Sequence, residues 1–110
     1  EIYSEQRLRE LRNSNQIVFL NFTADWCITC KVNERVALKT QKVQKILKRE
    51  SINYLEADWT RKDEMIASKL EEFGRSGVPL YLHYPSKGKP IILPEILTED
   101  ILIKYLLEVR

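Results

Sequence analysis

Residues 16–38, QIVFLNFTADWCITCKVNERVAL, decide the fold of this chain. The continuous apolar run at 16–22 has the length of a buried strand. From Cys27 onward the sequence favours a helix, with Val32 and Val36 one turn apart. The only two cysteines, in Cys27-Ile28-Thr29-Cys30, therefore begin a helix directly after a buried strand.

The rest of the chain alternates between helices and strands. Ser4 and Thr98 are predicted to cap the first and last helices. Gly74 is predicted to end a helix whose apolar face carries Ile66, Leu70 and Phe73. We expect helices near 4–15, 40–50, 63–74 and 98–109, and strands near 52–58, 80–84 and 91–93. The order predicts an α/β protein: a mixed sheet covered by helices on both faces, with an antiparallel edge. This is the outline of a thioredoxin fold in a single domain, residues 1–110.

Composition excludes several classes of function. The 110 residues are 44% hydrophobic and 31% charged, with a formal charge of +2 and the signs interspersed. These values argue against disorder, a nucleic-acid surface and a polybasic membrane arm. No apolar stretch approaches the ~20 residues that cross a bilayer, so we expect no membrane insertion by this segment. The chain starts at Glu1 and its only methionine is Met65, so we expect a mature or excised domain.

The position of the cysteines predicts redox chemistry. A thiol at a helix N-terminus is close to unpaired N–H donors and the positive end of the helix dipole, which favour the thiolate. We therefore expect Cys27, exposed at the tip, to be the nucleophile. Cys30, one turn further in, is expected to resolve the mixed disulfide.

Other interpretations of the cysteines remain open. A structural disulfide would close a loop of only four residues and stabilise little. A zinc site within the chain lacks ligands because His83 is the only histidine, which leaves a metal shared between chains. A single histidine in a strand is commonly a surface residue or lies on an edge strand, so we assign His83 no role.

Four further residues are candidate site residues. Trp26 either belongs to a docking surface beside Cys27 or packs in the core. Val78-Pro79 at the start of a strand is compatible with a cis bond, and the Val78 backbone could pair with an extended substrate. Glu34, on the same helix face as the cysteines, could accept the proton of Cys30 or be a solvated side chain. Trp59 is expected to pack in the core or a loop.

The segments ADWCITCKVNE, YLEADWTRKD, GRSGVPLY and LPEILT together resemble the C-terminal periplasmic domain of the DsbD family of thiol:disulfide interchange proteins. The resemblance implies a redox pair at Cys27 and Cys30, a helix carboxylate at Glu34 and a cis-proline at Pro79. Asn21 stands where the family carries a buried aspartate, so Glu34 would manage the proton alone or with water. Ile28, in place of the glycine usual in thioredoxins, would add an apolar side chain for docking a protein.

The resulting prediction is a protein-disulfide reductase that needs no bound cofactor. The resemblance implies that it passes electrons from the transmembrane part of a DsbD-type protein to that protein's N-terminal periplasmic domain. We expect a monomeric periplasmic domain of an inner-membrane protein, whose partners are protein thiols and disulfides rather than nucleic acid. The alternatives are a stand-alone periplasmic oxidant or isomerase and a non-catalytic metal-binding or interaction module.

Overall fold

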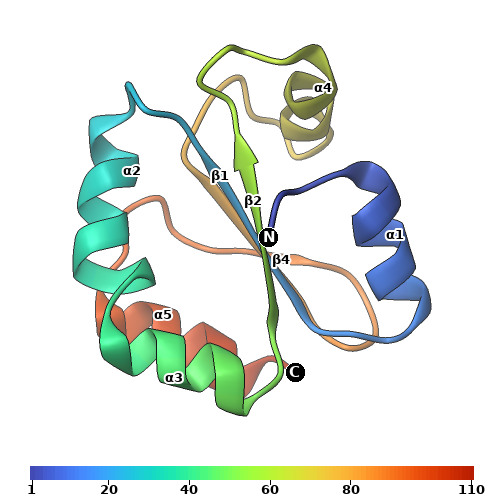
Figure 1. Ribbon diagram of the computed structural model, residues 1–110, viewed down its shortest axis with the longest axis vertical. Helices are drawn as coiled ribbons and strands as arrows, with labels where there is room; N and C mark the ends of the chain where they lie inside the picture. Colours follow the sequence, from blue (N-terminus) through green and yellow to red (C-terminus); the bar gives the residue numbers. More distant parts are fainter.

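The computed structural model describes residues 1–110, which form five α-helices, one turn of π-helix and four strands (Figure 1). In chain order these are α1 (Glu5–Asn13), β1 (Val18–Thr23), α2 (Ile28–Asn33), η1 (Glu34–Leu38), α3 (Gln41–Arg49), β2 (Asn53–Asp58), α4 (Glu64–Glu72), β3 (Leu80–Tyr84), β4 (Ile91–Ile92) and α5 (Glu99–Glu108). None of the helices has the length and apolar character that crossing a membrane requires.

The four strands form one mixed sheet in the order β2-β1-β3-β4. β1 is parallel to β2 and antiparallel to β3, and β4 adds an antiparallel edge beside β3. β1 has a strand on each side and helices over each face, which explains why all six of its residues are buried. The predicted thioredoxin fold is confirmed.

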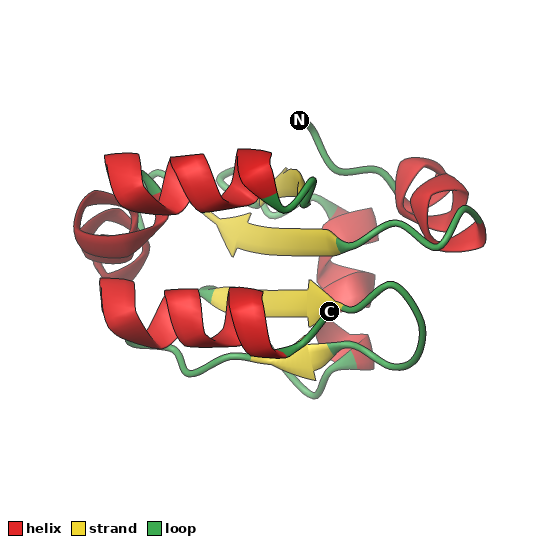
Figure 2. Ribbon diagram, turned by 90° about the horizontal axis from the view of Figure 1, so that it is seen from below, coloured by secondary structure: helices red, strands yellow, loops and turns green.

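Helices lie on both sides of the sheet (Figure 2). One apolar layer on each face holds them there. Val18, Leu20 and Phe22 of β1 point to the face covered by α1 and α4. Phe19 points to the opposite face, covered by η1, α3 and α5. Because side chains alternate along a strand, Asn21 and Thr23 lie on the same face as Phe19, beneath the helices that follow the cysteines.

Side chains at the helix N-termini fix where the helices begin. The hydroxyls of Ser4 and Thr98 accept hydrogen bonds from Arg7 N and Ile101 N, as predicted. Gly74 follows α4 with a φ of +72°, a left-handed conformation that suits glycine and ends the helix.

The helix that starts after Cys27 changes geometry at Glu34. The expected continuous helix becomes a π-helical turn over Glu34–Leu38, in which Lys39 N donates to Glu34 O at 2.8 Å. The wider turn still directs Glu34, Ala37 and Leu38 inward and leaves Val36 exposed. A π-turn is rare and is often found beside functional sites.

His83 is not at the surface, contrary to expectation. β3 is paired on both sides, by β1 and β4, so it is not an edge strand. His83 is fully buried, and its Nε2 lies 2.5 Å from Val109 O at the end of the chain. Burial lowers the pKa of the imidazole below its usual range.

Candidate active site

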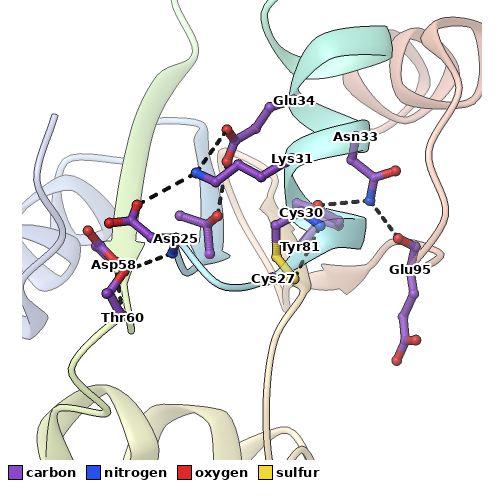
Figure 3. Close-up of a disulfide and its surroundings, with 11 residues drawn as sticks. Asp25, Cys27, Cys30, Lys31, Asn33, Glu34, Asp58, Thr60, Tyr81 and Glu95 are labelled. Atoms are coloured by element: carbon purple, nitrogen blue, oxygen red, sulfur yellow. Dashed lines mark hydrogen bonds and ion pairs between the residues drawn. A yellow bond between two sulfur atoms is a disulfide. The ribbon is translucent and has the colours of Figure 1, made fainter.

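The two cysteines form a disulfide at the N-terminal end of α2 (Figure 3). Cys27 is the N-cap residue, and its Sγ accepts a hydrogen bond from Cys30 N at 3.2 Å. We expected an exposed Cys27, but only 7% of its surface is accessible, because Ala24 and Val78 pack against the disulfide. Cys30 is fully buried, so a partner molecule can reach the disulfide only at Cys27.

The loop before Cys27 is held by the connection from β2 to α4. Trp26 Nε1 donates to Thr60 O at 3.0 Å, and Asp25 N donates to Thr60 Oγ1 at 2.9 Å. Thr60 in turn donates through its backbone N to Asp58 Oδ1 at 2.9 Å, and the Thr60 hydrogen bonds lower the pKa of Asp58. The position of Cys27 is thus fixed by side chains from two different loops.

Trp26 is at the surface, whereas Trp59 is in the core. Trp26 is 49% exposed, which excludes the alternative that it is a buried core residue. Its ring centroid lies 6.0 Å from that of Trp59, which is 9% exposed and packs in the core as expected. Lys62 Nζ lies 5.5 Å from the Trp26 ring centroid and 5.8 Å from that of Trp59, at cation–π distance.

The segment just before β3 brings Val78 to the disulfide. The Val78–Pro79 peptide bond is cis. Val78 is half-buried against Ala24 and the two cysteines, and Pro79 is buried. Ile28, the residue after Cys27, is 80% exposed. Of the predicted substrate-contacting residues, Val78 therefore touches the cysteine cluster, while Trp26 and Ile28 offer apolar surface to solvent.

Glu34 is buried, so the solvated alternative is wrong. It is 6% exposed, and its Oε2 accepts a hydrogen bond from Thr23 Oγ1 at 2.9 Å. Its Oε1 lies 3.6 Å from Lys31 Nζ (Figure 3). The same oxygen lies 3.7 Å from Lys39 Nζ, and both lysines are exposed. The Glu34 side chain therefore points from η1 toward the protein interior. One carboxylate oxygen faces Thr23 of the sheet, and the other faces the two lysines.

Asn21 occupies the same polar layer under the helices. Its Nδ2 donates to the Tyr54 hydroxyl at 2.9 Å, but its buried Oδ1 has no hydrogen-bond partner. Burial raises the pKa of Tyr54 above its usual range, so the phenol stays neutral. Unlike a carboxylate, the Asn21 amide cannot take up a proton at neutral pH, as expected from the sequence.

Asn33, one turn after Cys30, makes the most hydrogen bonds of any side chain near the site, and the sequence analysis did not identify it. Its Nδ2 donates to the Tyr81 hydroxyl at 2.9 Å and to Glu95 O at 2.7 Å, and its Oδ1 accepts from Leu97 N at 3.1 Å. Burial raises the pKa of Tyr81 to about 12. Asn33 thereby joins α2 to β3, two residues after Pro79, and to the segment before α5. An amide amid the apolar residues of the helix was the only available signal.

A large cleft lies beside the site rather than at the cysteines. It has a volume of about 1000 Å³, and Glu5, Asp25, Asp58, Asp63 and Lys69 are among its lining residues. The cleft does not include either cysteine, so we place the chemistry at the disulfide and not in the cleft. Nowhere do three or more His, Cys, Asp or Glu side chains gather in a way that could hold a metal ion.

Comparison with known sequences finds a matching family and several relatives. Residues 1–86 match a family described as thioredoxin-like. The thiol:disulfide interchange protein DsbD of Photorhabdus laumondii is 32% identical over 93 residues, or 83% of this chain and 16% of that protein. The protein of the same name from Yersinia pestis is 35% identical over 74 residues, or 67% of this chain and 12% of that protein. The chain thus spans less than a fifth of the length of these relatives.

Comparison with solved structures agrees with the observed fold. The C-terminal domain of DsbD from Neisseria meningitidis, in the oxidised form, superposes with a TM-score of 0.79 and 23% sequence identity. The match covers 99% of this chain and 98% of that one. The reduced form of the same domain gives a TM-score of 0.78 over the whole of both chains.

Proposed function

This chain belongs to the thioredoxin-like family, and we propose that it is a thiol–disulfide oxidoreductase that reduces disulfides in partner proteins. The observation that carries the proposal is the Cys27–Cys30 disulfide at the start of α2, in which Cys27 keeps 7% of its surface exposed and Cys30 is fully buried. The relatives from Photorhabdus laumondii and Yersinia pestis, both called thiol:disulfide interchange protein DsbD, support the same activity.

The reaction starts from the dithiol form. The Cys27 thiolate, stabilised by the N–H groups and dipole of α2, attacks one sulfur of the partner disulfide. A mixed disulfide forms between Cys27 and the partner, and the other partner sulfur leaves as a thiolate. Val78 and Pro79 hold the attacked segment, with the Val78 backbone pairing to it, while Trp26 and Ile28 provide apolar contact.

The second step releases the partner. Cys30 loses its proton to Glu34, and its thiolate attacks Cys27 Sγ. The Cys27–Cys30 disulfide forms, and the bond between Cys27 and the partner breaks. Two electrons have then passed to the partner, which leaves as a dithiol. No bound cofactor takes part, because the redox couple is in the side chains.

The wider route is part of the same proposal. We place the domain in the periplasm, as one monomeric unit of an inner-membrane protein of the DsbD type. Its two electrons would come from a dithiol in the transmembrane part and go to the N-terminal periplasmic domain. The resemblance of most of the chain to a small part of the DsbD proteins supports this route.

Equilibration with glutathione or dithiothreitol, followed by a count of free thiols, tests the direction of electron flow. A reduction potential near or below about −200 mV is expected for a reductant. A potential near about −120 mV would indicate an oxidant and would overturn the proposal.

Trapping tests the roles of the two cysteines. Cys30→Ser should accumulate a mixed disulfide on Cys27, because the resolving thiol is missing. Cys27→Ser should trap none, because Cys30 is fully buried. Trapping through Cys30 alone would contradict the assignment.

A further inference from the structure

Basic side chains are concentrated in the segment that follows Cys30. Residues 31–49 hold seven of the 18 Lys and Arg residues and only one of the 16 Asp and Glu residues. The charges are interspersed over the chain as a whole, but they are segregated here. The single acid, Glu34, is buried, whereas the seven basic residues are all exposed: Lys31, Arg35, Lys39, Lys42, Lys45, Lys48 and Arg49.

An apolar row on α2 and η1 runs away from the disulfide. Ile28, Val32 and Val36 are spaced four residues apart and are 80%, 41% and 42% exposed. Residues four apart on a helix lie one above the other. The row begins beside Cys27, and α2 lies at the outside of the molecule with no element covering it (Figure 1).

A basic row runs alongside the apolar one. Lys31, Arg35 and Lys39 have the same spacing, and together with Ile28, Val32 and Val36 they form what we call the α2 face. Lys31 and Lys39 share one carboxylate, that of Glu34. Lys31 also lies 3.7 Å from Asp25, whereas Arg35 forms no ion pair. The positive charge of this face is therefore only partly neutralised within the chain.

We propose that the α2 face docks the redox partner, and that the partner carries acidic side chains beside the apolar rim of its reactive disulfide. This inference rests on the proposed function and adds the chemistry of the partner to it. The apolar row continues directly from the reactive sulfur, so a protein bound at Cys27 also covers it. The basic side chains beside the apolar row then require Asp or Glu on the partner. This charge complementarity speeds the encounter of the two proteins and fixes the orientation in which they bind.

The composition of the face favours a protein over a lipid surface. Helices that lie on membranes insert large apolar side chains, often Trp, Phe and Leu. The α2 face offers one isoleucine and two valines, and neither tryptophan lies on it. An apolar strip of this kind beside a disulfide suits a small protein–protein contact.

The distance along the helix defines the probe. Arg35 is eight residues after Cys27, or about 12 Å at 1.5 Å per residue. An extended peptide spans that distance in about four residues. Two disulfide-bridged peptides, identical except for Glu or Lys three to five positions from the reactive cysteine, therefore place opposite charges at this face. We expect the reduced protein to react about tenfold faster with the Glu peptide at low salt, and this preference to vanish at about 0.5 M salt.

Two matched charge reversals locate the effect. Arg35→Glu, on the α2 face, should slow the reaction with the Glu peptide about five- to tenfold. Lys45→Glu, on α3, should change the rate of the same reaction less than about twofold. Both variants change the net charge equally. Equal effects of the two variants, or equal rates for the two peptides, would overturn the proposal. Arg35-dependent binding to phosphatidylserine vesicles would assign the face to a membrane instead and would also overturn it.

A small neutral disulfide separates failure of the inference from failure of the proposed function. Hydroxyethyl disulfide is too small to reach Arg35, so the wild type and both variants should reduce it at the same rate. If the wild type does not reduce it, the proposed reductase activity fails, and the inference fails with it. If all three proteins reduce it but do not discriminate between the peptides, only the docking face is wrong.

Discussion

Replacing Asn33 with alanine should cost this protein a large part of its stability. Asn33 makes three hydrogen bonds, of which those to the Tyr81 hydroxyl and to Leu97 N are buried and that to Glu95 O is partly buried. A lost hydrogen bond that leaves a buried group unpaired costs about 1–3 kcal/mol, whereas water can replace Asn33 at the Glu95 carbonyl. The two buried losses sum to about 2–6 kcal/mol, against a total of about 5–15 kcal/mol for a typical domain.

Urea denaturation of the oxidised protein, followed by circular dichroism, measures this loss. The matched control is Asn13→Ala, because Asn13 is exposed and its side chain makes no hydrogen bond, so its effect should stay within about 0.5 kcal/mol. A loss below about 1 kcal/mol for Asn33→Ala would show that water enters the cavity and satisfies the three groups. The reasoning about the junction between α2 and β3 would then be refuted.

Three further predictions concern the polar layer and the buried histidine. Glu34→Gln should slow the release of a mixed disulfide on Cys27 by about 100-fold in single-turnover kinetics, with Glu10→Gln, an exposed control, unchanged. Thr23→Val should lower the free energy of unfolding by about 1–3 kcal/mol, because the Glu34 carboxylate loses its only hydrogen bond; an unchanged urea midpoint would contradict this. Since burial lowers the pKa of His83, its neutral form stabilises the fold fully above about pH 6.5, and stability falls as the pH drops toward the lowered pKa. His83→Gln should reduce the pH dependence of the free energy of unfolding by up to about 1.4 kcal/mol per pH unit in this range. An identical dependence on pH for both proteins would refute this prediction.

The sequence was sufficient for the parts of the fold that depend on local signals. Helix caps such as Ser4 and Thr98 satisfy the N–H groups of their own helices, so a few residues decide them. The apolar run of β1 indicates burial on both faces without further knowledge. The placement of Cys27 at a helix start followed from the same two neighbouring elements.

Features that depend on distant segments could not be predicted. The burial of His83 requires β4 on one side and the contact with Val109, which neighbouring residues in its own strand do not reveal. The burial of Glu34 depends on Thr23 and on the π-turn, for which no sequence signal was available. The three bonds of Asn33 reach partners 48 to 64 residues away, and its type alone does not specify them.

The two outer edges of the sheet have consequences for pairing with other strands. Beside β2, the first residues of the chain form a short parallel bridge: Ile2 pairs with Glu56, and Tyr3 N donates to Glu56 O at 2.9 Å. At the other edge, β4 is two residues long and is flanked by Pro90 and Pro94, which have no N–H to donate. Neither edge offers a long row of free backbone groups that could template another chain. Pairing of two copies of the domain edge to edge is therefore disfavoured on both sides of the sheet.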